Sequence, residues 1–129
     1  MAYEKPTEVV ASAARTASGQ SGTLDCQDAE NMAYEKPTEV VASAAENLSL
    51  LVDVTAVTGT TPTLDLSVEW SSDNGTTWFK ADTADTLAQI TAAKKTAKRF
   101  SALASWFRVV WTIGGTTPSF TFAVDRYLT

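Results

Sequence analysis

Two segments with the pattern Gly-Thr-Thr-Pro followed by an alternating strand constrain the fold of this chain more than any other feature. GTTPTLDLSV fills residues 59–68, and GTTPSFTFAV fills residues 115–124. Glycine allows a sharp backbone bend, while proline ends the pairing of one strand and fixes φ at the start of the next. Each segment is therefore expected to join the strands of a hairpin. Because each hairpin has one apolar face, two antiparallel sheets packed face to face are the natural solution.

The neighbouring text has the period-two alternation of half-buried strands. Apolar and polar side chains alternate in LDLSVEW, residues 64–70, and WFRVVWTI, residues 106–113, divides into two faces in the same way. Asn74-Gly75 follows the first of these strands and supplies the positive φ angles of a tight hairpin turn. We therefore expect an all-β protein, an antiparallel β-sandwich of jelly-roll-like form.

The four tryptophans divide between the two faces of these strands. Trp70 and Trp111 fall on the core faces by alternation, whereas Trp78 and Trp106 fall on the opposite register and are candidates for exposed aromatic contacts. Exposed indoles on a sheet can stack against sugar rings or against a protein partner. The plainer alternative is that they fill the ends of the sandwich or a subunit interface.

The segment between the hairpins, residues 82–105, is compatible with two structures. Its alanines and lysines suit a helix, but LAQIT (87–91) and AKRFSAL (97–103) can also form two short strands around a turn. We favour the strands. The only basic run of the chain lies here, and a solvated turn is the simplest interpretation, with contact to nucleic acid or an acidic partner as the alternative. It consists of Lys94, Lys95, Lys98 and Arg99.

The sequence MAYEKPTEVVASAA occurs twice, at residues 1–14 and again at residues 32–45. Ala-Glu-Asn stands on both sides of the second copy, so removal of residues 32–47 leaves a continuous connection into a strand that begins at Leu48. Solenoid repeats diverge and usually recur at least three times, which does not fit two identical copies. A recent tandem duplication, an artefact of the recorded sequence and a functional arm in two copies are the three explanations.

We therefore divide the chain into an N-terminal arm, residues 1–47, and a β-sandwich domain, residues 48–129. Residues 32–47 are interpreted as an insertion or artefact, and the core fold is expected to need only 1–31 and 48–129. The arm is expected to be a flexible terminus, and the alternative is that it lies on a neighbouring subunit. In that case Val9, Val10 and Arg15 are the candidate contacts to a partner.

The side-chain inventory excludes several kinds of site. The chain has no histidine and a single cysteine, Cys26, which removes the commonest general base, zinc sites of the His or Cys type and an internal disulfide. No phosphate loop or calcium loop matches. We therefore expect no catalytic, cofactor-binding or metal-binding residues and no enzyme. The net charge of −5 argues against nucleic acid, and no apolar stretch is long enough to span a membrane.

Two long phrases resemble small virion proteins of tailed bacteriophages, which are β-sandwich proteins of the capsid decoration (cement), minor capsid or tail-associated kind. They are VDVTAVTGTTPTLDLSVEWSSDNGTTWF, residues 52–79, and FRVVWTIGGTTPSFTFAVD, residues 107–125. The resemblance covers Leu48–Asp125 well and Ala11–Asn31 loosely, and residues 32–47 depart from it. Its motifs mark a fold, so no catalytic residue is carried over.

The resemblance implies a structural role in the virion, assembled in the cytoplasm of a bacterial host. A decoration protein sits as a trimeric knob on the major capsid protein of the phage and stabilises the head. Its N-terminal arm lies along the shell, so Val9, Val10 and Arg15 would be capsid contacts. The alternative is a tail- or fibre-associated module that contacts host glycans through Trp78 and Trp106.

Overall fold

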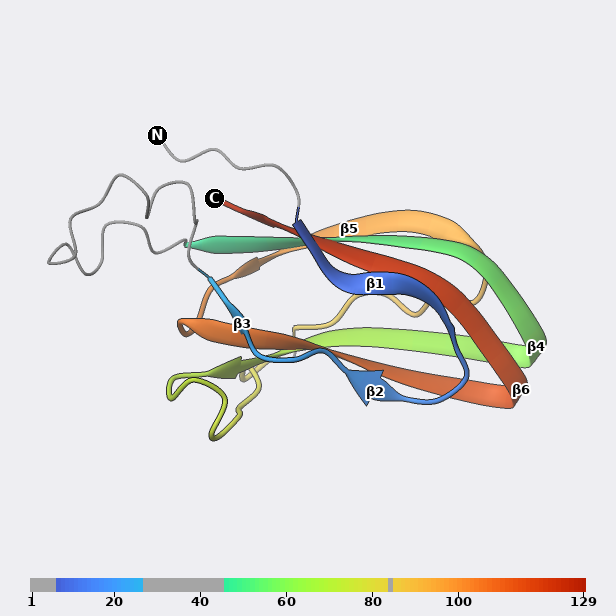
Figure 1. Cartoon of the computed structure of the whole chain (residues 1–129), viewed down its shortest axis with the longest axis horizontal. Coiled ribbons are helices and arrows are strands. Elements are labelled where there is room, and N and C mark those ends of the chain that lie inside the picture. The colour runs from blue at the N-terminus through green and yellow to red at the C-terminus, as the bar shows by residue number, and fades with distance from the viewer. Residues whose placement is uncertain (1–6, 27–45, 84) are drawn as a thin grey trace, which may run out of the picture.

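The computed structural model of this chain describes residues 7–26, 46–83 and 85–129 (Figure 1). All regular structure in these ranges is strand, and every pairing between strands is antiparallel, which confirms the all-β prediction. None of the described residues forms a helix that could cross a membrane. The strands are β1 (Thr7–Arg15), β2 (Gly19–Gln20), β3 (Leu24–Asp25), β4 (Asn47–Ser71), β5 (Lys94–Ser101) and β6 (Trp106–Leu128).

The architecture is one long two-stranded ribbon that folds over on itself. β4 and β6 pair antiparallel along nearly their whole length, from Leu48 opposite Leu128 to Ser71 opposite Trp106. Figure 1 shows both strands turning back at the same end of the molecule, which produces two layers. We call the layer with β1, β5, residues 47–58 and residues 119–128 the upper layer, and the layer with residues 63–71, residues 106–113, β2 and β3 the lower layer. This is the expected sandwich.

The fold-over is built by the two Gly-Thr-Thr-Pro segments, which lie opposite each other. Thr60 pairs with Thr116, and the backbone angles of the two segments nearly coincide, with φ of 114° at Gly59 and 112° at Gly115. A Cβ added at Gly59 would lie 2.8 Å from the Cα of Pro118, so a larger residue does not fit. The internal repeat therefore places two equivalent bends side by side and folds both strands at once. The expectation that each bend joins the two strands of a hairpin is wrong, because each bend lies within one continuous strand and its two arms pair with the other long strand.

The core fills the space between the layers by simple alternation. Trp70 and Trp111 are buried, as predicted, and contact the rings of Phe107 and Phe122 respectively. Burial of this much apolar surface is the main source of stability of such a fold. The inward residues of the two long strands are Leu48, Leu50, Val52, Val54, Leu64, Leu66, Val68 and Trp70 on β4, and Phe107, Val109, Trp111, Phe120, Phe122, Val124 and Leu128 on β6.

The N-terminal residues that the structure describes belong to the sandwich, so it begins before Leu48, contrary to our expectation. β1 pairs with β6 between Thr7 and Arg15, and β2 and β3 pair with the lower half of β6. Val10 is only 4% exposed and joins the core. An arm drawn over all of residues 1–47 is therefore wrong for residues 7–26. Residues 1–6 and 27–45, which include most of the second copy, lie outside the described residues.

The middle segment contains strand and no helix in its described part, which confirms the interpretation that we favoured. β5 covers Lys94–Ser101 and pairs with β4. The LAQIT stretch is less regular than expected: it makes one isolated bridge, from Ile90 to Leu64. The Asn74-Gly75 turn has φ angles of 56° and 87°, as its sequence predicts.

Candidate functional site

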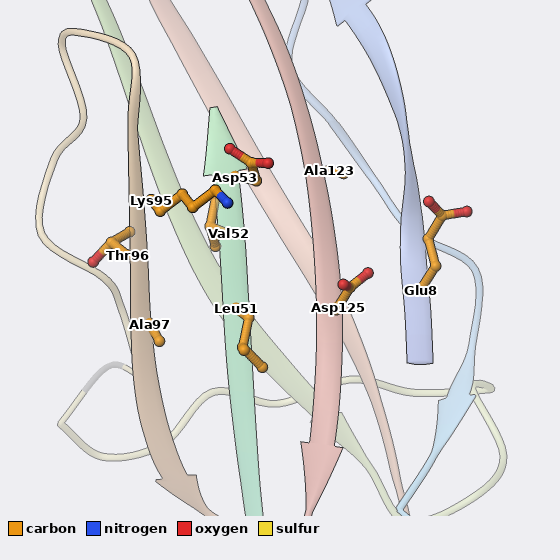
Figure 2. A pocket seen from close by; sticks show the side chains of 9 residues that line it. All are labelled: Glu8, Leu51, Val52, Asp53, Lys95, Thr96, Ala97, Ala123 and Asp125. Atoms are coloured by element: carbon orange, nitrogen blue, oxygen red, sulfur yellow. The ribbon is translucent and has the colours of Figure 1, made fainter. Parts of the chain in front are cut away.

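A hollow of the surface lies on the outer side of the upper layer (Figure 2). It is an open groove of about 520 Å³ to which four strands contribute. Leu51 lies between Ala97 and Asp125, Glu8 lies beyond Asp125, and Asp53 and Lys95 lie together further along the strands. The lining residues are Glu8 from β1, Leu51, Val52 and Asp53 from β4, Lys95, Thr96 and Ala97 from β5, and Ala123 and Asp125 from β6.

Strand register explains why these side chains meet. In one row across the sheet, Glu8 lies opposite Asp125, Asp125 lies opposite Leu51, and Leu51 lies opposite Ala97. In the next row on the same face, Asp53 lies between Ala123 and Lys95. Leu51 is 37% exposed, which is unusual for a large apolar residue at the centre of a four-stranded sheet. We call the outward residues of these two rows, together with Arg99 further along β5, the upper outer face.

The charges of the upper outer face have no partner within the described part of the chain. None of Glu8, Asp53, Lys95, Arg99 and Asp125 makes an ion pair or side-chain hydrogen bond there. Glu8 and Asp125 are like charges placed directly opposite each other across two strands, an arrangement that destabilises a sheet. Asp53 and Lys95, in the next row, are opposite charges that attract each other, so the unrelieved repulsion lies on the Glu8 and Asp125 side of the face.

The outer side of the lower layer is different, because its charges are satisfied internally. Glu69 and Arg108 face each other across β4 and β6 and form an ion pair of 2.6 Å. The ring of Trp78 stacks on the guanidinium of Arg108, whose Cζ lies 4.4 Å from the ring centroid. Lys80 lies 4.0 Å from Glu69 and adds a weaker contact.

The two candidate aromatic contacts are both partly exposed and come to the same side of the molecule. Trp106 and Arg108 share the outward face of β6 because Phe107 between them is buried. Trp78 reaches that face through its contact with Arg108. One side of the Trp78 ring is therefore covered by the chain itself, and the other side is the one that a ligand could use.

The three candidate arm contacts are used within the sandwich to different degrees. Val10 is buried in the core, and Val9 packs against it while partly exposed. The Arg15 guanidinium lies 5.0 Å from the ring centroid of Trp111 and donates a 2.6 Å hydrogen bond to the carbonyl of Ala11. Burial in the core keeps Val10 from contacting a partner. Val9 and Arg15 are partly exposed, and contact of these two side chains with a partner stays a prediction.

The basic run lies on an edge strand instead of a solvated turn. Lys98 points toward the inner side of β5 and donates a 2.8 Å hydrogen bond to the carbonyl of Thr86 at the other layer. Lys95 and Arg99 point outward, since they pair with the outward residues Asp53 and Ser49. Lysines on an edge strand also discourage unwanted pairing with other sheets.

Two titratable side chains in residues 7–26, 46–83 and 85–129 have clearly shifted pKa values, and both shifts have structural causes. Burial raises the pKa of the Cys26 thiol to about 12, although nearby Arg126 opposes the effect. Hydrogen bonds from Thr77 and Ser71 lower the pKa of Asp73 to about 2 and order the turn after β4. Among the described residues, no three side chains of the His, Cys, Asp or Glu type come together as metal ligands do.

Sequence reasoning missed the upper outer face. Its residues stand at outward positions of recognised strands, so their exposure could have been inferred, but the strand order that brings them together could not. Comparisons with protein-family models, with curated proteins and with solved structures gave no match to this chain.

Proposed function

We propose that this chain is a structural protein of a bacteriophage virion, which decorates the outer surface of the capsid and stabilises the head. The single observation that carries the proposal is the upper outer face. It combines an exposed leucine and a groove with small residues with five charges that have no ion pair in the described part of the chain, so a protein partner could cover the apolar surface and pair the charges.

The sandwich supports this role because it is a compact body with few long loops in its described part. The phrases that resemble phage virion proteins form its frame: the paired bends at residues 59–62 and 115–118 and the turn at Asn74-Gly75. A rigid subunit loses little conformational entropy when it binds. If it binds the assembled shell but not the free shell subunits, it stabilises the shell by mass action. The net charge of −5 favours basic patches on the capsid as the binding site.

The test is the number of copies of this chain in purified particles, measured by quantitative mass spectrometry. A number close to that of the major capsid protein is the expected result for a decoration protein. A few copies per particle would instead support a tail or fibre protein, and complete absence would refute both. Adding the purified chain back to stripped particles should raise the temperature at which the heads release their DNA.

A second candidate function is favoured by the outer side of the lower layer, where Trp78 and Trp106 are both partly exposed. A tail- or fibre-associated module could stack these indoles on host glycans. Soluble sugars should then protect tryptophan fluorescence from quenching, and Trp106→Phe should reduce the protection. Trp70 and Trp111 are buried and provide an internal reference in the same spectrum.

A further inference from the structure

We propose that the upper outer face binds a second copy of this chain, with the acidic side of one copy against the basic side of the other. The inference rests on the proposed function only in taking this face as a protein-binding surface, and it gives the face to a second copy in place of the capsid. It adds the identity of the partner and the orientation in which it binds.

The first step is the distribution of charge across the face. Carboxylates lie on the β1 and β6 side, where Glu8 is opposite Asp125. Cations lie on the β5 side, where Lys95 and Arg99 point outward. Leu51 lies between the two sides. Asp53 also lies between them, on β4 beside Lys95. The face is thus acidic toward β1 and basic toward β5, along the direction perpendicular to its strands.

The second step is the absence of partners for these charges within the described part of the chain, which was shown above. The lower layer demonstrates that the same fold can satisfy such charges, because Glu69 and Arg108 pair at 2.6 Å across the same two strands. Cations brought close to Glu8 and Asp125 would relieve their mutual repulsion. The basic side of the same face is a source of cations available to every copy.

The third step is the choice of occupant. A uniformly basic partner would relieve Glu8 and Asp125 but would oppose Lys95 and Arg99, and a uniformly acidic partner would do the reverse. A second copy satisfies both sides when it is related by a twofold axis parallel to the strands. That rotation turns the faces toward each other and places β5 of each copy over β1 and β6 of the other.

The same arrangement covers the exposed apolar surface. The axis runs beside Leu51, so the two copies of this side chain meet near the centre of the interface. Ala97 and Ala123 leave the hollow that receives them. Sheets packed in this way lie about 10 Å apart. The product is a dimer, whereas the resemblance to decoration proteins implied a trimer.

The experiment measures the mass of the full chain by sedimentation equilibrium over a wide concentration range. The wild type is expected to be in equilibrium between monomer and dimer. The double variant Glu8→Lys with Asp125→Lys should have a dimer dissociation constant at least ten times higher than that of the wild type. The double variant Lys95→Glu with Arg99→Glu should show the same increase. Mixing the two variants should restore a dimer of one chain of each kind, because the reversed charges then match. Restored association also shows that both variants are folded.

A matched control is Asp65→Lys with Asp82→Lys, which changes the net charge as the first variant does but alters exposed carboxylates outside the upper outer face. It should dimerise like the wild type. The proposal is overturned if the wild type is a monomer at all concentrations, if it is a trimer, or if the mixed variants fail to associate. These outcomes are independent of the copy number in particles, so failure of this inference and failure of the proposed function are distinguishable.

Discussion

Removing the second copy of the duplicated segment should leave the sandwich intact. Deletion of Met32–Asn47 joins Asn31 to Leu48, and the retained pair Glu30-Asn31 takes the place of Glu46-Asn47. The structure uses Glu46 and Asn47 through their backbones, which bond to Thr129 and Ala102. Because the replacing residues are identical, every one of these bonds can form again.

The shortened connection can still span the distance required. The N–H of Cys26 donates to the carbonyl of Ser105, and the carbonyl of Glu46 accepts from the N–H of Ala102. Both ends of the connection are therefore held by residues 102–105, a stretch that is roughly 10 Å long when extended. Residues 27–29, which remain between the two ends, reach about 14 Å when extended.

The magnitude follows from the entropy of closing the loop. Shortening the connection from residues 27–45 to residues 27–29 lowers the closure cost by about 1.5 kcal/mol, because this cost grows with the logarithm of loop length. For a domain of this size, the midpoint of thermal unfolding should rise by roughly 6 °C. The assay is thermal unfolding followed by circular dichroism, compared with the full chain under the same conditions.

A matched deletion of residues 2–14 removes nearly the same letters from the other copy and should abolish the cooperative transition, because it removes β1. The second copy cannot replace β1 within its own chain. Ala14 pairs with Thr121, so Ala45 would have to lie there as well, yet Glu46 is bonded to Thr129. These two places on β6 are about 26 Å apart, whereas adjacent residues are about 3.8 Å apart. Loss of cooperative unfolding in the first deletion, or its survival in the second, would refute the reasoning.

Three further predictions concern single side chains. Gly59→Ala should destabilise the fold by about 2 kcal/mol, since φ at Gly59 is 114° and the new Cβ would lie 2.8 Å from the opposite backbone. The control Gly22→Ala has open space around the new Cβ and should leave the melting midpoint unchanged. Arg15→Ala should lower the free energy of unfolding by about 1 kcal/mol and change the fluorescence of Trp111, because their 5.0 Å contact is lost; an unaltered spectrum would contradict that contact. Cys26 should resist alkylation at pH 8 until the protein is denatured, and rapid labelling of the native protein would count against its burial. Its pKa is raised to about 12, so the thiol contributes stability that is complete below its ordinary pKa near 9.0 and is lost as the pH rises toward 12.

The strands of the ribbon and their inward faces could be predicted from the sequence because they depend on local signals. Period-two alternation correctly predicted that Trp70 and Trp111 are buried. The Asn74-Gly75 turn has the positive φ angles that its residue types allow. The Gly-Thr-Thr-Pro segments were recognised as bends for the same reason, but they were expected to close hairpins, whereas each lies within one continuous strand. The sequence did not show that the two bends lie opposite each other, since that requires the register of β4 against β6.

The candidate site depended on long-range pairing and could not be predicted in the same way. Glu8 and Asp125 are far apart in the sequence and meet because β1 adds to β6. Val10 was interpreted as part of a free arm because a short apolar pair near a terminus carries no local mark of the strand that it will join. Val10 is buried because β1 pairs with the edge of β6, and that edge exists only in the folded sheet.

The sequence by itself determined the alternation of apolar and polar side chains, the two bends and the packing into two antiparallel layers. These features depend on side-chain period and backbone φ preferences, which act within a few residues. The tertiary structure alone decided which edges are occupied, which charges are paired and which are left facing outward. Those outcomes depend on strand order and register, which are selected by the total burial and hydrogen bonding of the whole sheet.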